Sequence, residues 1–169
     1  MRKAGQNICE ARIIMATKVI MNDDAFLKKG FLISTDKTLL DVQLIYHFLD
    51  KLSYWGKGIS FDTVQTSIQN SMCFGVYHNQ TQVGFARTIT DLATFAYVCD
   101  VFILPDYRKS GLSKWLMQTI RNHPNLKNLR RLVLATADAQ GLYEQFGFAQ
   151  LKNHDRWMEI FQPRQEEPA

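Results

Sequence analysis

Residues 104–120, LPDYRKSGLSKWLMQTI, carry side chains whose types and spacing suit the binding of an anion. Two cations are followed by three small residues, namely Arg108, Lys109, Ser110, Gly111 and Ser113. The first N–H groups of a helix have no partner inside it and carry the positive end of its dipole, so a helix that starts here offers a pyrophosphate site. Glycine lets a phosphate approach the backbone, and serine hydroxyls can donate hydrogen bonds. The same residues are also compatible with an ordinary capped turn bearing two solvated charges.

Asp100 is a second candidate for chemistry, because this carboxylate interrupts the apolar run at residues 94–104. Side chains alternate along a strand, so Asp100 is expected to share a face with Phe102. Burial among apolar neighbours would raise the pKa of the carboxyl group toward the range of a general base. An ion pair with Arg87, in which Asp100 only organises the site, is an equal alternative, and a proton relay through water is a third.

Three runs in the middle of the chain have the β-branched and aromatic content of strands and are separated by polar turns. They predict an antiparallel meander formed by residues 72–78, 82–90 and 94–104. Upstream, a further strand is predicted at residues 30–36. Asp41 is suited to cap an amphipathic helix over residues 41–52, and Ser60 is suited to cap a second helix.

The candidate anion-binding segment lies inside a predicted βαβ unit. Apolar residues recur at helical spacing from Leu112 to Ile120, which predicts a helix over residues 110–122. The strand before it and the continuously apolar, buried strand at residues 130–136 should be parallel, with a right-handed crossover. The result is a mixed α/β sheet with helices on its faces, completed by a short helix that ends at Gly147 and a last strand at residues 156–161.

The composition predicts one domain with a modest preference for anionic partners. A chain of 169 residues that is 46% hydrophobic can build one complete core. The formal charge of +4, from 20 basic and 16 acidic residues, favours an anionic ligand without requiring nucleic acid. The three cysteines, Cys9, Cys73 and Cys99, form no CxxC pair and no metal-ligand cluster. We therefore expect a reducing cytoplasm, no disulfide framework and no metal.

The chain ends suggest no targeting segment. Basic residues precede a short apolar stretch near the N-terminus, but Arg12 and Lys18 crowd or interrupt it and no clean cleavage site follows, so a signal peptide is not predicted. No segment approaches the roughly 20 apolar residues that span a bilayer. We expect an N-terminal extension at residues 1–29, in which Met15 or Met21 is an alternative start to Met1. The domain then occupies residues 30–162, with a polar tail at 163–169.

Two segments resemble signatures of the GNAT superfamily of N-acetyltransferases. DVFILPDYRKSGLSKWL, residues 100–116, is similar to the coenzyme-A-binding motif R/Q-x-x-G-x-G/A behind a strand, with Ser113 where the family usually has glycine or alanine. LATADAQGLYEQFGF, residues 134–148, resembles the second signature. The resemblance extends from about Phe31 to Phe161. It implies an α/β fold with about seven mostly antiparallel strands, a central βαβ unit and about four helices.

The resemblance also implies how acetyl-CoA is bound and used. The preceding strand should pair with the pantetheine arm through Val101, Phe102 and Ile103, and a backbone N–H near its end should face the developing oxyanion. Asp138 or Gln140 falls where the family contacts pantetheine. The pyrophosphate would be cradled by the backbone amides of Arg108, Lys109, Ser110, Gly111, Leu112 and Ser113.

Tyr143 occupies the position at which many family members place the tyrosine that protonates the departing thiolate. A phenol can donate a proton at neutral pH, although a tyrosine packed by its ring on a helix is the alternative. The family places the acceptor beside the segment between the first two helices, here SYWGKG. Tyr54 and Trp55 could stack on an amine there or form a hydrophobic plug, and Phe85 and Arg87 are further wall candidates.

The implied function is acetyl transfer from acetyl-CoA to a primary amine of a small molecule, polyamine or protein. A coenzyme-A-binding sensor with little transferase activity is the alternative, although retention of both Tyr143 and Asp100 favours the enzyme. A nucleic-acid-binding module is not expected, because its basic cluster is short and lacks interleaved aromatics: Arg121, Lys127, Arg130 and Arg131. Many relatives are dimers, so a homodimer is compatible with the resemblance, but no sequence feature identifies an interface.

Overall fold

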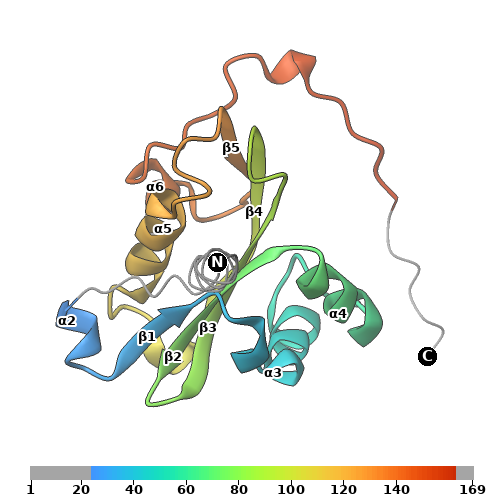
Figure 1. Ribbon diagram of the computed structural model, residues 1–169. Helices are drawn as coiled ribbons and strands as arrows, with labels where there is room; N and C mark the ends of the chain where they lie inside the picture. The colour runs from blue at the N-terminus through green and yellow to red at the C-terminus, as the bar shows by residue number, and fades with distance from the viewer. Residues whose placement is uncertain (1–23, 163–169) are drawn as a thin grey trace, which may run out of the picture.

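The computed structural model describes residues 24–162, in which five strands form one mixed sheet in the order β1-β2-β3-β4-β5. Neighbouring strands are antiparallel except β4 and β5, which are parallel (Figure 1). The predicted meander and βαβ crossover are therefore confirmed. The strand bounds are β1 Phe31–Ser34, β2 Met72–His78, β3 Thr81–Thr90, β4 Phe95–Ile103 and β5 Arg131–Leu134.

The described residues contain five α-helices, and two of these helices begin at the N-cap residues expected from the sequence. The carboxylate of Asp41 accepts the Leu44 amide at 2.9 Å, and the Ser60 hydroxyl accepts the Thr63 amide at 3.2 Å. The first predicted helix continues into a π-helical turn, η2 (Phe48–Leu52). The helix bounds are α2 Asp24–Leu27, α3 Val42–His47, α4 Phe61–Gln69, α5 Leu112–Asn122 and α6 Gln140–Glu144.

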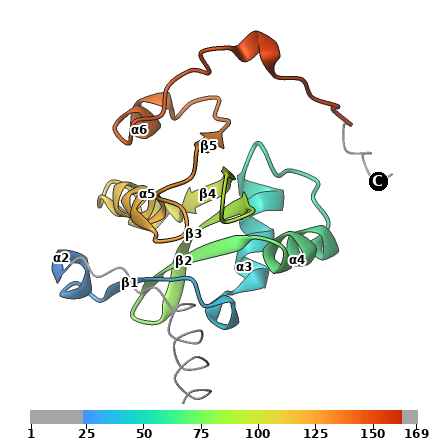
Figure 2. The same ribbon diagram turned by 45° about the horizontal axis from the view of Figure 1, so that its top comes forward.

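Helices cover both faces of the sheet, and each face has its own apolar core (Figures 1 and 2). On one face, α5 packs with Leu116, Met117 and Ile120, which are fully buried. On the other face lie α3 and α4, whose side chains pack with Phe85 and Phe102 of the sheet. The amphipathic helical patterns read from the sequence are what this two-sided burial requires.

Strand β4 contains a bulge at the position that matters most for the site. Phe85 pairs with Phe102 and Arg87 pairs with Cys99, so two residues of β4 oppose one residue of β3. Asp100 lies in the bulge and has a φ of +53°. The simple alternation expected for Asp100 and Phe102 therefore does not hold across this part of the strand.

Two boundaries differ from the sequence predictions. Residues 24–29 were expected in the extension, yet α2 packs on the domain, with the Phe26 ring 4.6 Å from the Trp115 ring. The prediction of a last strand at residues 156–161 is wrong for this structure, because the segment finds no strand partner among residues 24–162. The described sheet therefore has fewer strands than the expected seven, although the α/β class is confirmed. Cys9, the candidate start codons and the polar tail lie outside the described residues.

Candidate active site

A cavity of about 690 Å³ opens where β4 and β5 part. The two strands pair only as far as Val98 and Leu134, after which β4 continues paired with β3 and residues 135–139 leave the sheet. The start of α5, helix α6 and the loop after η2 complete the walls. Many of the predicted site residues line this one space: Tyr54, Trp55, Asp100, Val101, Phe102, Ile103, Arg108, Lys109, Leu112, Ser113, Asp138 and Tyr143.

The turn before α5 presents free backbone amides, as its sequence predicted. Gly111 is the N-cap of α5 with a φ of +88°, a left-handed conformation that favours glycine. Its carbonyl accepts the Trp115 amide at 3.0 Å, which closes the first helical turn. The amides of residues 109–114 donate to none of the described residues. The start of α5 therefore has the unpaired N–H groups and the helix-dipole orientation that favour an anion.

Arg108 and Ser110 make contacts within the protein that bear on their predicted part in binding a pyrophosphate. The Arg108 amide donates to the Pro105 carbonyl at 3.1 Å, so it is not among the free amides. The Arg108 Nε atom donates to the Ile103 carbonyl at 3.0 Å, which ties the turn to the end of β4. The Ser110 hydroxyl donates to the Tyr107 carbonyl. Ser110 and Gly111, which were predicted to bind the cofactor, are not among the residues that line the cavity.

Tyr143 lies on α6 at the cavity wall, with its ring 5.9 Å from that of Phe148. Burial, with smaller contributions from Tyr54 and Asp138, raises the pKa of the Tyr143 phenol to about 12. The group is therefore fully protonated at neutral pH. A protonated phenol at the cavity wall can donate a proton at neutral pH, and it cannot act as a base at that pH.

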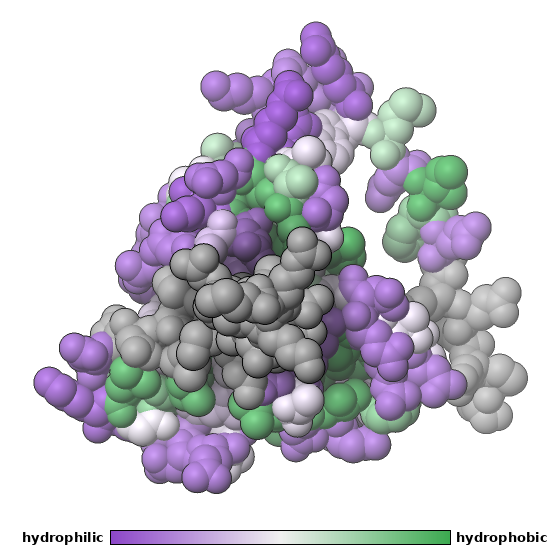
Figure 3. All heavy atoms as spheres, viewed as in Figure 1, coloured by the Kyte–Doolittle hydropathy of each residue, from purple (hydrophilic) through white to green (hydrophobic). Residues whose placement is uncertain are grey.

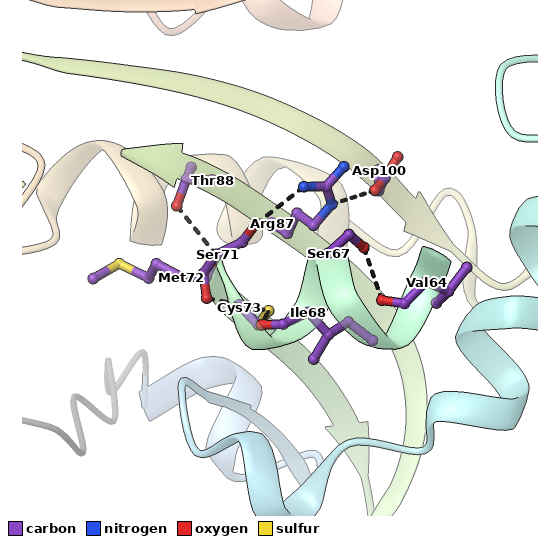
Figure 4. Close-up of polar contacts among 9 residues, drawn as sticks. All are labelled: Val64, Ser67, Ile68, Ser71, Met72, Cys73, Arg87, Thr88 and Asp100. Carbon is purple, nitrogen blue, oxygen red and sulfur yellow. Dashed lines mark hydrogen bonds and ion pairs between the residues drawn. The ribbon is translucent and has the colours of Figure 1, made fainter. Parts of the chain in front are cut away.

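Asp100 forms an ion pair that the sequence analysis offered as one of its alternatives. Arg87 Nε lies 2.5 Å from Asp100 Oδ2, and Arg87 Nη1 donates to the Ser71 hydroxyl at 3.0 Å (Figure 4). Both charged side chains are mostly buried, with 15% and 13% exposed. The pair joins β3 to the β4 bulge and fixes the Asp100 carboxylate at the cavity wall.

The loop after η2 reaches across the cavity to the segment that follows β5. The Tyr54 hydroxyl accepts the Ala137 amide at 3.2 Å and lies 3.4 Å from Asp138 Oδ1. The Trp55 ring packs edge-on against Tyr54 with 5.0 Å between centroids. Tyr54 is 59% exposed and Trp55 39% exposed, so the pair is not a buried plug.

Two of the predicted wall residues lie elsewhere. Phe85 is fully buried in the core, where its ring lies 6.0 Å from Phe102. Arg87 lines a separate hollow beside α4. The sequence analysis also missed several residues that line the cavity, because no local pattern marks them and the fold brings them together: Phe48, Tyr97, Cys99, Tyr107 and Leu142. Within residues 24–162, no cluster of candidate metal ligands occurs and no helix is long and apolar enough to cross a membrane.

Comparisons with known proteins place the chain in one family. Residues 69–150 match the family model of the acetyltransferase (GNAT) domain. A protein of Gibberella zeae whose name assigns it to the acetyltransferases is 31% identical over 67% of this chain and 75% of the relative. The chain belongs to the GNAT family and is an acyltransferase of the N-acetyltransferase class.

Solved structures agree with this assignment. A structure from Xanthomonas campestris pv. campestris, described as belonging to the GNAT family, is 46% identical, with a TM-score of 0.77 over 79% of this chain and 94% of that chain. The ribosomal-protein-S18-alanine N-acetyltransferase of Escherichia coli is 23% identical, with a TM-score of 0.59 over 72% of this chain and 79% of that chain. At that identity the second likeness concerns the fold alone.

Proposed function

We propose that this protein transfers the acetyl group of acetyl-CoA to a primary amine by direct attack of the amine on the thioester. One observation carries the proposal: a single cavity of about 690 Å³ is lined by the turn before α5, the end of β4 that extends beyond its pairing with β5, and the protonated Tyr143. Acetyl-CoA supplies an activated acyl group and a thiolate leaving group. The residues around the cavity must hold the donor, admit the amine and manage the protons.

The residues present fit the donor. The free amides of residues 109–114 and the side chains of Arg108 and Lys109 supply partial and full positive charge for a pyrophosphate. Beyond Val98, β4 has no β5 partner, so its backbone groups toward the cavity are available to the amides of a pantetheine arm. A backbone N–H at the end of β4 would stabilise the negative charge that develops on the carbonyl oxygen.

Two proton transfers are required. The attacking amine must lose a proton, either to Asp100 or to water that Asp100 orients. The ion pair with Arg87 favours the second role, because the Arg87 Nε–H group already occupies one of the two carboxylate oxygens of Asp100. Tyr143 supplies the proton to the departing thiolate, since its phenol is protonated throughout the neutral range.

The part of the cavity beside Tyr54 and Trp55 is suited to bind the acceptor amine in its protonated, cationic form. Tyr54 and Trp55 present exposed ring surface, and the carboxylates of Asp100 and Asp138 line the same cavity. Aromatic faces and carboxylates both attract an ammonium group. The amine of a small molecule, a polyamine or a protein lysine would meet these requirements.

A thiol-release assay over a panel of amines tests the proposed reaction. We expect turnover with at least one primary amine and none with alcohols of the same shape. Calorimetry should show that the wild type binds acetyl-CoA and that Gly111→Glu does not, because the new carboxylate repels the phosphates and the φ of +88° disfavours a side chain. Gln118→Glu, which adds the same charge at an exposed position of α5, is the matched control. Binding without turnover on any amine would favour the sensor over the enzyme.

A further inference from the structure

The turn before α5 contains two residues in the left-handed region of backbone conformation. Lys109 has a φ of +61° and Gly111 a φ of +88°. Glycine adopts this region freely, but a residue with a side chain does so at a cost, so the backbone at Lys109 is strained. Such strain persists only where the surrounding structure holds it in place. The turn therefore requires support from residues outside it.

Phe26 of α2 lies against the helix side of this turn. Its Cζ atom is 3.4 Å from the point at which a side chain on Gly111 would begin. The same ring stacks on Trp115, with 4.6 Å between the ring centres and 5° between the ring planes. Because the Trp115 amide donates to the Gly111 carbonyl, Phe26 packs against both ends of the first turn of α5.

Phe31, the first residue of β1, connects Phe26 to the other flank of the turn. Its ring packs edge-on against Phe26, with 6.2 Å between centres, and against Tyr107, with 6.3 Å between centres. Tyr107 ends the short helix η3 (Pro105–Tyr107), directly before the turn, and lines the cavity. The rings thus form a continuous series that spans the turn, which we call the aromatic brace: Trp115, Phe26, Phe31 and Tyr107.

Half of the aromatic brace comes from a part of the chain that precedes the matched family region. That region covers residues 69–150, whereas α2 and β1 come before it. Hydrophobic side chains gather at the lower left of the molecule, where α2 and β1 lie (Figures 1 and 3). Phe26 and Phe31 are half-buried and pack on the core of the α5 face. Since an isolated helix as short as α2 is not stable, its place depends on this packing.

We propose that Phe26 is a positioning residue for the donor, whose ring holds the turn before α5 in the conformation that presents the amides of residues 109–114 to the pyrophosphate of acetyl-CoA. The inference rests on the proposed function and adds α2 to the parts of the chain that determine donor affinity. A preorganised site binds more tightly, because little conformational freedom is lost when the ligand arrives. Without the ring the strained turn relaxes, and binding must restore it.

Two donors that share one thioester test this role in the full chain. S-acetylpantetheine lacks the pyrophosphate, so its use does not depend on the turn. By calorimetry, Phe26→Ala should raise the Kd for acetyl-CoA at least about tenfold, which corresponds to about 1.4 kcal/mol. With an amine that the thiol-release panel identifies, kcat/KM for S-acetylpantetheine should stay within about twofold of the wild type. A general loss of structure would impair both donors.

Phe61→Ala is the matched control, because Phe61 is also a half-buried ring that packs edge-on, with 5.5 Å between its centre and that of Tyr46. Phe61 lies on α4, on the opposite face of the sheet from α5, so its loss should leave the Kd for acetyl-CoA within about twofold. Circular dichroism and urea unfolding establish that each variant is folded. If Phe26→Ala is not folded, Phe26→Leu replaces it, with an expected rise in Kd of at least about threefold.

The proposal is overturned if the Phe26 variant binds acetyl-CoA within about twofold of the wild type, or if Phe61→Ala weakens binding as much. It is overturned equally if kcat/KM for S-acetylpantetheine falls as far as the affinity for acetyl-CoA, since the ring would then support the whole cavity. A wild type that binds acetyl-CoA but acetylates no amine would refute the proposed transfer, and calorimetry would still decide the role of Phe26. A wild type that does not bind acetyl-CoA would refute both.

Discussion

Replacing Tyr143 with phenylalanine removes one hydroxyl from the cavity wall and leaves the ring that packs on Phe148. The structure records no hydrogen bond from this hydroxyl to residues 24–162, so the fold should tolerate the change. Positioned general acids contribute typically 10²–10⁴-fold to rate. We expect kcat to fall about a hundredfold, which corresponds to about 2.7 kcal/mol of transition-state stabilisation. The KM for acetyl-CoA should change by less than about threefold, because the hydroxyl acts on the leaving thiolate and not on the bound donor.

The pH profile gives a second readout of the same prediction. An acid is active while protonated, so its contribution is lost as pH rises through its pKa. Because burial raises the pKa of Tyr143 to about 12, the wild-type rate should show no fall from this group up to about pH 10. An alkaline decline that disappears in Tyr143→Phe would contradict the raised pKa.

Tyr107→Phe is the matched control, because Tyr107 also lines the cavity and loses the same hydroxyl. Rates are measured by thiol release with saturating amine and varied acetyl-CoA. The reasoning is refuted if Tyr143→Phe keeps kcat within about twofold of the wild type, or if Tyr107→Phe falls as far.

Three further substitutions test the ion pair beside the cavity and the apolar core. Arg87→Met leaves Asp100 without its cation and should cost about 2 kcal/mol in urea unfolding, somewhat below the range for fully buried pairs because 13% of that carboxylate side chain is exposed. If Asp100 only orients water with the help of Arg87, Asp100→Asn and Arg87→Met should slow turnover by similar factors, and the double variant should be no slower than either single variant. A much larger loss of turnover in Asp100→Asn alone would identify Asp100 as the base. Leu116→Ala should lower the free energy of unfolding by about 2–5 kcal/mol, since the side chain is fully buried. A loss under about 1 kcal/mol would show that the core on the α5 face collapses to fill the space left by the leucine side chain.

Local features of the fold were predictable because each depends on neighbours in sequence. Asp41 and Ser60 cap the helices that they were expected to cap. The turn at Gly111 could be recognised before the structure, since a glycine after two cations and before an amphipathic helix satisfies local requirements that no distant residue changes. The crossover between β4 and β5 followed from the order of elements.

Sequence alone was enough to predict the turn before α5, the meander, the parallel pair of strands and the membership of a family with recognisable signatures. Tertiary structure alone decided how the opposite wall is assembled. The Tyr54 hydroxyl accepts the Ala137 amide across 83 positions of the chain, and the bulge at Asp100 is a property of the pairing of β4 with β3. Phe85 was assigned to the wall but is in the core, since alternation does not say which face of a sheet is buried more deeply. Such contacts depend on strand register and loop closure, which hydrophobic periodicity does not encode.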